Sequence, residues 1–172
     1  MSALKLFARP LIALAAVASL SACATTPMGP VYGGAMSSTF SAADFAWSER
    51  SGPASIDGRV DYRRDGQAFA CTGSVVLTPV TPYTRHRFQT LYGSTDRAAL
   101  PASVVRSRNV PDPNGDYRSY VRQATCANNR FAYEGLPDGE WFLIATVSAG
   151  GDPIVLMQRV QTRGGRRVPV TL

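Results

Sequence analysis

The segment RFAYEGLPDGEWFLIA, residues 130–145, carries the strongest information about the fold of this chain. Phe131 and Tyr133 occupy alternate positions, as in a strand with one buried face. The sequence Leu136-Pro137-Asp138-Gly139 places proline at the second position of a turn, where its fixed φ is favourable. An apolar run then continues to Val147. The segment therefore predicts two strands joined by a tight turn.

The same alternation occurs in two runs upstream. In the first run the alternate positions are Ile56, Gly58, Val60 and Tyr62. In the second they are Phe69, Cys71, Gly73, Val75 and Leu77. The turn sequence Arg64-Asp65-Gly66 follows the first run, and Pro79 and Pro82 end the second. Phe45 and Trp47 also alternate, and this pattern predicts a further short strand with one buried face.

Turn residues divide the rest of the chain into more short segments. Asn128-Asn129 suits a hairpin, because asparagine tolerates the left-handed region. Glycine pairs at 150–151 and 164–165 precede a predicted strand at residues 154–161 and the last strand, Val168-Pro169-Val170. We expect residues 117–125 to be extended, whereas residues 98–108 fit either a strand or an irregular crossing.

Residues 81–93 carry the signals of one short helix. Thr81 can cap its start, Pro82 suits the first helical position and Gly93 can end it. The side chains expected along one face are those of Tyr83, Phe88, Leu91 and Tyr92. The central residues Arg85, His86 and Arg87 predict a solvated basic turn. Catalysis by His86 is the alternative, but a general base needs an orienting carboxylate, and both sequence neighbours of His86 are cations.

Several of these residues resemble the carboxypeptidase-regulatory-like, transthyretin-like β-sandwich modules. The resemblance lies in Gly58-Arg59-Val60, Gly66, Val75-Val76-Leu77 and the segment at residues 130–141. Asn129 stands where that family usually has glycine, Trp141 replaces a tyrosine, and a long insertion with the helical segment leaves the strand order open. The resemblance implies an antiparallel sandwich used as an accessory or binding module. Many short alternating strands with Gly/Pro turns independently favour an all-β antiparallel β-sandwich with one short helix.

The N-terminal residues Leu20-Ser21-Ala22-Cys23 resemble the bacterial lipoprotein lipobox. Lys5 and Arg9 precede an apolar run at residues 11–20, which is the order of regions in a secretory signal peptide. The resemblance implies cleavage between Ala22 and Cys23 and lipid on Cys23. We therefore divide the chain into a signal peptide at 1–22, a lipidated flexible tether at 23–43 and a β-sandwich domain at 44–172. An ordinary secretory signal is the alternative.

The residue after the predicted lipidated cysteine bears on location. It is Ala24, not the aspartate that in Gram-negative lipoproteins often retains a protein at the inner membrane. We therefore expect attachment to the periplasmic face of the outer membrane, with membrane lipid as a partner through Cys23. The formal net charge of +6 would suit nucleic acid, but export to the envelope excludes that partner.

The predicted signal peptide also bears on the three cysteines. If Cys23 carries lipid, Cys71 and Cys126 remain as two thiols in an oxidising compartment, which predicts a disulfide between them. Two buried free thiols are the alternative. Zinc is not expected, because two cysteines and the single histidine do not supply a tetrahedral site. We expect no cofactor.

Two groups of acidic residues are candidate sites. Asp112 and Asp116 flank a long turn, but their spacing does not match a calcium-binding EF-hand loop. Glu134, Asp138 and Glu140 crowd the turn at residues 136–139 and could form an acid pair for a carboxylate-based hydrolase. Charged residues beside a tight turn are more commonly its solvated rim.

The sequence contains no nucleophile elbow and no phosphate-binding loop. The leading functional hypothesis is a non-enzymatic envelope lipoprotein whose β-sandwich binds or scaffolds another envelope component. The alternative is a module that binds an envelope glycan or polyanion. Its candidate contacts are Trp47, which also fits a core position, and Arg163, Arg166 and Arg167, which also fit a solvated hairpin end.

Overall fold

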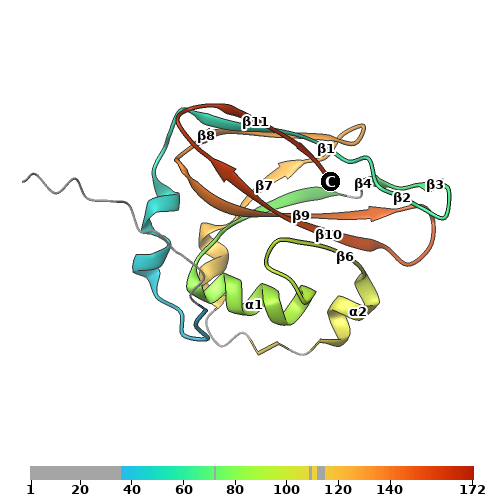
Figure 1. Cartoon of the computed structure of the whole chain (residues 1–172), viewed down its shortest axis with the longest axis horizontal. Coiled ribbons are helices and arrows are strands. Elements are labelled where there is room, and N and C mark those ends of the chain that lie inside the picture. Colours follow the sequence, from blue (N-terminus) through green and yellow to red (C-terminus); the bar gives the residue numbers. More distant parts are fainter. Residues whose placement is uncertain (1–35, 72, 109, 112–114) are drawn as a thin grey trace, which may run out of the picture. The chain divides into compact units, whose positions relative to one another are not determined.

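The computed structural model describes residues 36–71, 73–108, 110–111 and 115–172. Two β-sheets lie face to face, and a helix lies on the far side of the larger one (Figure 1). The smaller sheet has the strand order β11 (Arg167–Thr171), β1 (Ala54–Arg59), β8 (Arg130–Leu136). The larger sheet has the order β6 (Arg97–Pro101), β10 (Ile154–Thr162), β9 (Gly139–Ser148), β5 (Ser74–Pro79), β7 (Arg122–Thr125), with β4 (Ala70–Cys71) also on β9.

Neighbouring strands run antiparallel except β1 and β11, which are parallel. A separate hairpin joins β2 (Arg63–Arg64) to β3 (Gln67–Ala68). Its turn residues Asp65 and Gly66 have φ angles of 51° and 79°, as the turn sequence predicts. The predicted all-β antiparallel sandwich is confirmed, with the β1–β11 pair as its parallel exception. The predicted helix, α1 (Pro82–Tyr92), is present, and a second helix of six residues occurs at Ala102–Ser107.

The main core lies between the two sheets, and the alternation seen in the sequence fills it. Ile56 of β1, Phe131 of β8 and Leu143 of β9 are each at most 4 % exposed. Of the residues of opposite parity, Asp57 of the smaller sheet is exposed, whereas Phe142 of the larger sheet is buried against α1. Gly58 is also buried, and a Cβ at this position would overlap the ring of Phe131 on the neighbouring strand. Because glycine has no side chain, the Phe131 ring can occupy that space.

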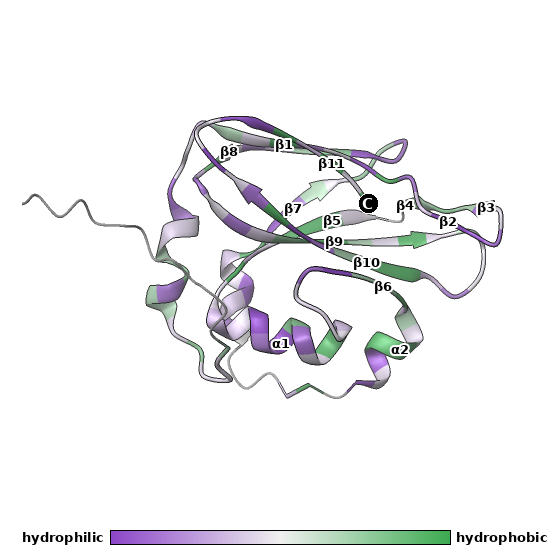
Figure 2. Ribbon diagram, in the orientation of Figure 1, coloured by the Kyte–Doolittle hydropathy of each residue, from purple (hydrophilic) through white to green (hydrophobic). Residues whose placement is uncertain are grey.

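The helix α1 (Pro82–Tyr92) has the predicted ends. The Thr81 hydroxyl accepts a hydrogen bond from the Thr84 N–H at 3.2 Å, and the Thr84 hydroxyl accepts one from the Thr81 N–H at 2.9 Å. Gly93 stops the helix with a φ of 73°. Hydrophobic and hydrophilic residues follow one another along α1 (Figure 2), and its buried side includes Phe88, which lies 4.6 Å from Phe142 of β9 between ring centroids.

The predicted strand at Phe45 and Trp47 is wrong. Phe45 lies between two consecutive 3₁₀-helices, η1 (Ala42–Asp44) and η2 (Ala46–Glu49), and Trp47 lies in η2. Two apolar residues are too few to establish the alternation of a strand. The two rings are both buried, but each packs against a different part of the molecule. Phe45 stacks on Tyr120 at 4.8 Å, whereas Trp47 meets Trp141 edge-on at 4.8 Å. The 3₁₀ conformation of this segment allows the two rings to reach these separate partners.

Residues 36–43, at the end of the predicted tether, contact the domain in the structure. The N–H of Ser37 donates to the carbonyl oxygen of Pro82 at 3.0 Å. The ring of Phe40 lies 5.8 Å from that of Tyr83. The predicted signal peptide, Cys23 and the tether up to residue 35 lie outside the described residues.

Other expected boundaries change. Residues 98–108 resolve into β6 and the short helix α2 (Ala102–Ser107). The expected extended run at 117–125 begins instead as the 3₁₀-helix η3 (Gly115–Tyr120) and is extended only in β7. After the Gly164-Gly165 turn the chain crosses to the smaller sheet, so the arginines there do not mark a hairpin end.

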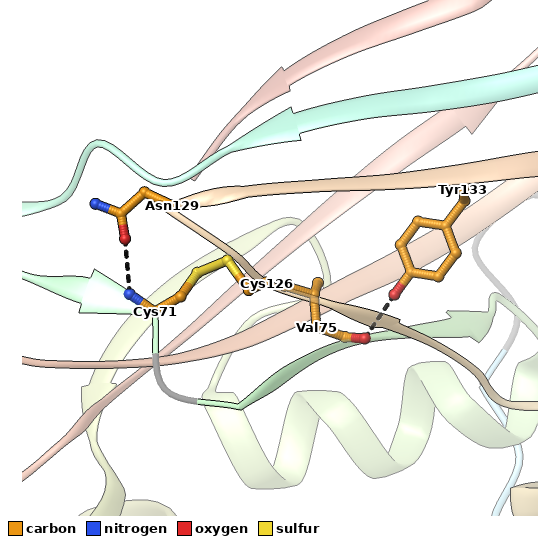
Figure 3. The surroundings of a disulfide bond; sticks show 5 residues. All are labelled: Cys71, Val75, Cys126, Asn129 and Tyr133. Atoms are coloured by element: carbon orange, nitrogen blue, oxygen red, sulfur yellow. Dashed lines mark hydrogen bonds between the residues drawn. A yellow bond between two sulfur atoms is a disulfide. The ribbon is translucent and has the colours of Figure 1, made fainter.

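The predicted disulfide between Cys71 and Cys126 is confirmed. The two Cα atoms are 6.0 Å apart, and the bond links β4 to the residue after β7 (Figure 3). The side chain of Asn129 accepts a hydrogen bond from the Cys71 N–H at 2.9 Å. Asn129 and Asn128 both have positive φ angles, 59° and 50°, as their sequence predicts. The bond and this turn fix the corner that leads from one sheet to the other.

Candidate functional site

A groove of about 360 Å³ opens on the outer face of the larger sheet, between α1 and the segment formed by η3 and β7. The residues that line it come from five parts of the chain: β5, α1, η3, β7 with the residue before it, and β9. Ligand sites in proteins are predominantly apolar hollows of about 300–1,000 Å³ with a few converging polar groups. The groove lies at the small end of that range and suits one small molecule or a short oligomer.

The floor of the groove is built from neighbouring strands. Val76 of β5 is paired with Ile144 of β9 on one side and with Gln123 of β7 on the other. Thr78 lies two residues further along β5 and shares the face of Val76, because side chains alternate along a strand. Val121, the residue before β7, also lines the groove. Strand pairing therefore fixes the positions of Val76, Gln123 and Ile144 in the floor.

Both walls of the groove carry aromatic rings. Phe88, Leu91 and Tyr92 of α1 form one wall, and Tyr117 and Arg118 of η3 form the other. The ring of Tyr92 lies 5.3 Å from that of Phe88, which holds it against the helix. A second set of contacts holds the opposite wall. The guanidinium of Arg87 sits 5.5 Å from the centroid of Tyr117, and the ring of Tyr83 lies 5.7 Å from the same ring.

Four of the lining residues carry uncharged polar groups. They are Thr78, Tyr92 and Tyr117, each with a hydroxyl, and Gln123, with a side-chain amide. Within the part of the chain that the structure describes, none of the three hydroxyls has a hydrogen-bond partner. Burial raises the pKa of Tyr92 to about 12, and nearby Tyr117 adds to the increase. Tyr92 therefore stays protonated at neutral pH, and it can both donate and accept a hydrogen bond.

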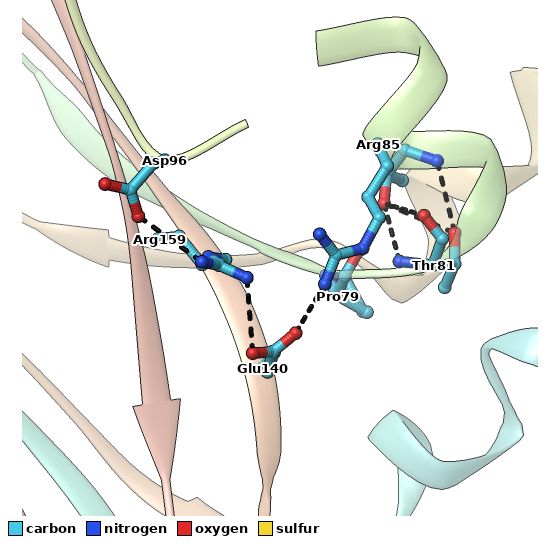
Figure 4. Close-up of polar contacts among 7 residues, drawn as sticks. Pro79, Thr81, Arg85, Asp96, Glu140 and Arg159 are labelled. Carbon is cyan, nitrogen blue, oxygen red and sulfur yellow. Dashed lines mark hydrogen bonds and ion pairs between the residues drawn. The ribbon is translucent and has the colours of Figure 1, made fainter. Parts of the chain in front are cut away.

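An ionic cluster lies near the first turn of α1. Nη2 of Arg85 is 2.6 Å from Oε2 of Glu140, and the other carboxylate oxygen faces Arg159 at 3.4 Å (Figure 4). Arg159 in turn approaches Asp96 at 3.5 Å. The predicted solvated turn is therefore wrong for Arg85, whose side chain is only 7 % exposed, although His86 is exposed. The cluster joins α1 to β9 and β10.

The acidic residues at the turn have separate partners. Both carboxylate oxygens of Glu140 contact arginines, so Glu140 does not belong to a solvated rim. Oδ2 of Asp138 accepts the N–H of Gly164 at 2.9 Å, and Glu134 is exposed on β8. None of the three lines the groove.

The residues proposed from sequence for ligand contact also lie elsewhere. Trp47 is 9 % exposed and belongs to the main core, where it fills the space beside Gly139. Arg163, Arg166 and Arg167 are exposed around the β10–β11 connection, and Arg167 lies 3.5 Å from Asp57. None of these four residues lines the groove.

The described ranges contain no group of three or more His, Cys, Asp or Glu residues that could hold a metal ion. Asp116 is exposed, while Asp112 lies outside those ranges. No helix in them is long and apolar enough to cross a membrane.

No sequence motif singles out Thr78, Tyr117 or Gln123. The usable signal is the second face of the strand at residues 74–79, where Val76 and Thr78 alternate with the core residues Val75 and Leu77. A strand without charged residues on either face is typically covered on both faces. That signal points to a second layer over the larger sheet, but it does not identify the residues brought there by η3 and β7.

No protein-family model and no curated protein matches this chain. Among solved structures, the chain is similar to a "putative carbohydrate binding protein" from Pseudomonas aeruginosa, with a TM-score of 0.52 and 20 % sequence identity. The match covers 77 % of this chain and 97 % of that protein. At this level of identity the likeness shows that the two proteins share a fold.

Proposed function

We propose that this chain is a lipid-anchored, non-enzymatic envelope protein whose β-sandwich binds a glycan in the groove between α1 and the larger sheet. The observation that carries the proposal is the groove itself, which has aromatic rings on both walls and lining hydroxyls without a hydrogen-bond partner among the described residues. The likeness to the "putative carbohydrate binding protein" from Pseudomonas aeruginosa supports the same class of ligand.

The chemistry of the groove suits a sugar ring. One face of many pyranose rings is lined by C–H groups, which can pack on Tyr92 or Tyr117, while the ring hydroxyls need partners that both donate and accept hydrogen bonds. The hydroxyl groups and the Gln123 amide supply both functions. Each satisfied hydrogen bond contributes about 0.5–1.5 kcal/mol net, and an unsatisfied buried group costs more. A few such contacts are enough for selective but weak binding.

The lipid anchor is proposed from the N-terminal sequence alone. Cleavage before Cys23 and acylation of that residue would attach the protein to the periplasmic face of the outer membrane. Mass spectrometry of the protein extracted from native membranes tests this directly. We expect an N-terminal acylated Cys23 and no residues before it. A freely dissolved, unacylated protein or a retained leader would remove the anchor from the proposal.

A glycan array followed by titration calorimetry tests binding, with the full chain purified in detergent. We expect Tyr117→Ala and Gln123→Ala to weaken binding of the best array ligand about tenfold each, which corresponds to about 1.4 kcal/mol. Tyr62→Ala is the matched aromatic control, because Tyr62 pairs with Phe69 outside the groove. The proposal fails if no glycan binds, or if the control weakens binding as much as the groove variants.

The three exposed arginines distinguish this proposal from polyanion binding at the β10–β11 connection. Changing Arg163, Arg166 and Arg167 together to alanine should leave glycan affinity unchanged, because none of them lines the groove. If this variant loses glycan binding while the groove variants keep it, the glycan site lies at the β10–β11 connection and not in the groove.

A further inference from the structure

We propose that the groove selects sugars that carry an acetamido group, with the amide and its methyl bound on the floor of the larger sheet. The inference rests on the proposed function and specifies the ligand for the same groove. It follows from the arrangement of four floor residues and not from the groove's size.

The floor places polar and apolar side chains next to each other. Val76 is paired with Gln123, and Thr78 lies two residues further along β5 on the same face. The Thr78 hydroxyl and the Gln123 amide therefore come from diagonal positions on two neighbouring strands, and Val76 lies beside both. Diagonal neighbours across an antiparallel pair are about 7–8 Å apart at Cα, so long side chains can reach one small group together.

An acetamido group matches this pattern. Its methyl can lie on Val76 and the neighbouring Ile144, while its N–H and C=O need one acceptor and one donor. Oε1 of Gln123 already accepts from the Ser74 hydroxyl at 3.5 Å, which leaves the amide N–H groups of Gln123 as donors to the ligand carbonyl. The hydroxyl of Thr78 can then accept the ligand N–H.

Other common sugar substituents fit the floor less well. A fully hydroxylated ring would place hydroxyls over Val76 and Ile144, where no partner is available on the floor. A 6-deoxy sugar supplies a methyl but leaves Thr78 and Gln123 unpaired beneath it, which is unfavourable for groups shielded from water. The floor residues Val76, Thr78, Val121, Gln123 and Ile144 are uncharged, and the cationic lining residue, Arg118, belongs to the wall. The floor therefore favours a neutral substituent.

The test compares three methyl glycosides with the full chain in detergent: those of N-acetylglucosamine, glucose and 6-deoxyglucose. We expect N-acetylglucosamine to bind at least about tenfold more tightly than either of the others. Saturation-transfer NMR should show the strongest transfer to the acetamido methyl. Equal binding of all three sugars, or tighter binding of the deoxy sugar, would overturn this inference and leave the glycan proposal standing. Absence of binding to every sugar and to the array would overturn both.

Thr78→Val isolates the hydrogen bond, because valine nearly preserves the shape of threonine. We expect the variant to lose most of its preference for the acetamido sugar while its weaker affinity for glucose stays within about twofold. Thr125→Val is the control, since Thr125 lies on β7 outside the groove. Circular dichroism must show both variants folded. An unchanged preference in a folded Thr78→Val protein, together with an unchanged preference in Gln123→Leu, would contradict the assigned floor contacts.

Discussion

At Gly58 the core has no room for a side chain, because the ring of Phe131 fills the space where a Cβ would stand. The two residues are paired across β1 and β8, so neither strand can move away without breaking the ladder between them. A similar relation joins Gly139 to Trp47. Single residues at strand positions thus decide how closely the layers of the sandwich approach.

This close contact makes a prediction for Gly58→Ala. The added methyl must displace Phe131 in a fully packed core, which typically costs about 1–3 kcal/mol. Urea unfolding should show a loss of that size. Gly151→Ala is the control, because a Cβ there would meet nothing within 4 Å, and its effect should stay within about 0.5 kcal/mol. Equal stability of the two variants would mean that Phe131 can move aside without cost.

Two buried tyrosines predict how stability depends on alkaline pH. Burial raises the pKa of Tyr92 to about 12 and raises that of Tyr133 further still. The unfolded chain loses these protons near pH 10, before the folded chain does, so it binds fewer protons above that pH and stability falls. We expect unfolding free energy to decline between about pH 10 and 12, and Tyr92→Phe to remove about 2 kcal/mol of that decline. An identical alkaline profile in the variant would contradict the assignment.

At the scale of elements, α1 is attached to the larger sheet by two different kinds of contact. Phe88 packs on Phe142, and Arg85 reaches Glu140 from the same helix. Glu140 also holds Arg159 of β10, so one carboxylate connects the helix with two strands. Because Phe88, Leu91 and Tyr92 form a wall of the groove, the position of α1 sets the width of the candidate site.

Removing the charge of Glu140 tests this attachment. Glu140→Gln leaves the buried Arg85 guanidinium without its anion, and breaking a fully buried pair costs about 3–5 kcal/mol. Since one-third of the Glu140 side chain is exposed, we expect a smaller loss of about 1–3 kcal/mol and faster amide exchange in α1. Asp152→Asn is the control, because the exposed pair of Asp152 with Arg106 spans 3.9 Å. Its stability should be nearly unchanged. Slow exchange in α1 of Glu140→Gln would show that the apolar contacts suffice.

The elements that the sequence predicts correctly have local signals. Turn residues such as Asp65-Gly66 and Asn128-Asn129, the capped ends of α1 and the alternation in β1 and β8 depend on neighbours close in the chain. The 3₁₀-helices at residues 42–49 and the burial of Arg85 depend on distant partners, Tyr120 and Trp141 in one case and Glu140 in the other. The groove is hardest to predict, because its residues meet only after β5, β7 and β9 have paired.

For the whole molecule, the order of strands explains why distant parts of the chain hold one another. The last strand, β11, lies parallel to the first, β1, and closes the smaller sheet. The disulfide closes a second long loop with a sequence separation of 55 residues, from β4 to the corner after β7. That corner leads directly into β8 and the fold-defining segment at residues 130–145. The disulfide therefore limits the conformations that the central part of the chain can adopt when the protein is unfolded.

The double variant Cys71→Ser/Cys126→Ser tests how much this restraint contributes. In the chain-entropy model, a loop of this length contributes about 4 kcal/mol, and measured effects are typically about 2–4 kcal/mol. We expect the double variant to unfold at lower urea concentration by a corresponding amount while keeping its native circular dichroism. A reductant should destabilise the wild-type protein by the same amount and leave the double variant unaffected, because the variant has no bond to reduce. If the double variant matches the oxidised wild-type protein in stability, packing at the corner, including the bond from Cys71 N–H to Asn129, holds the two sheets together without the covalent link.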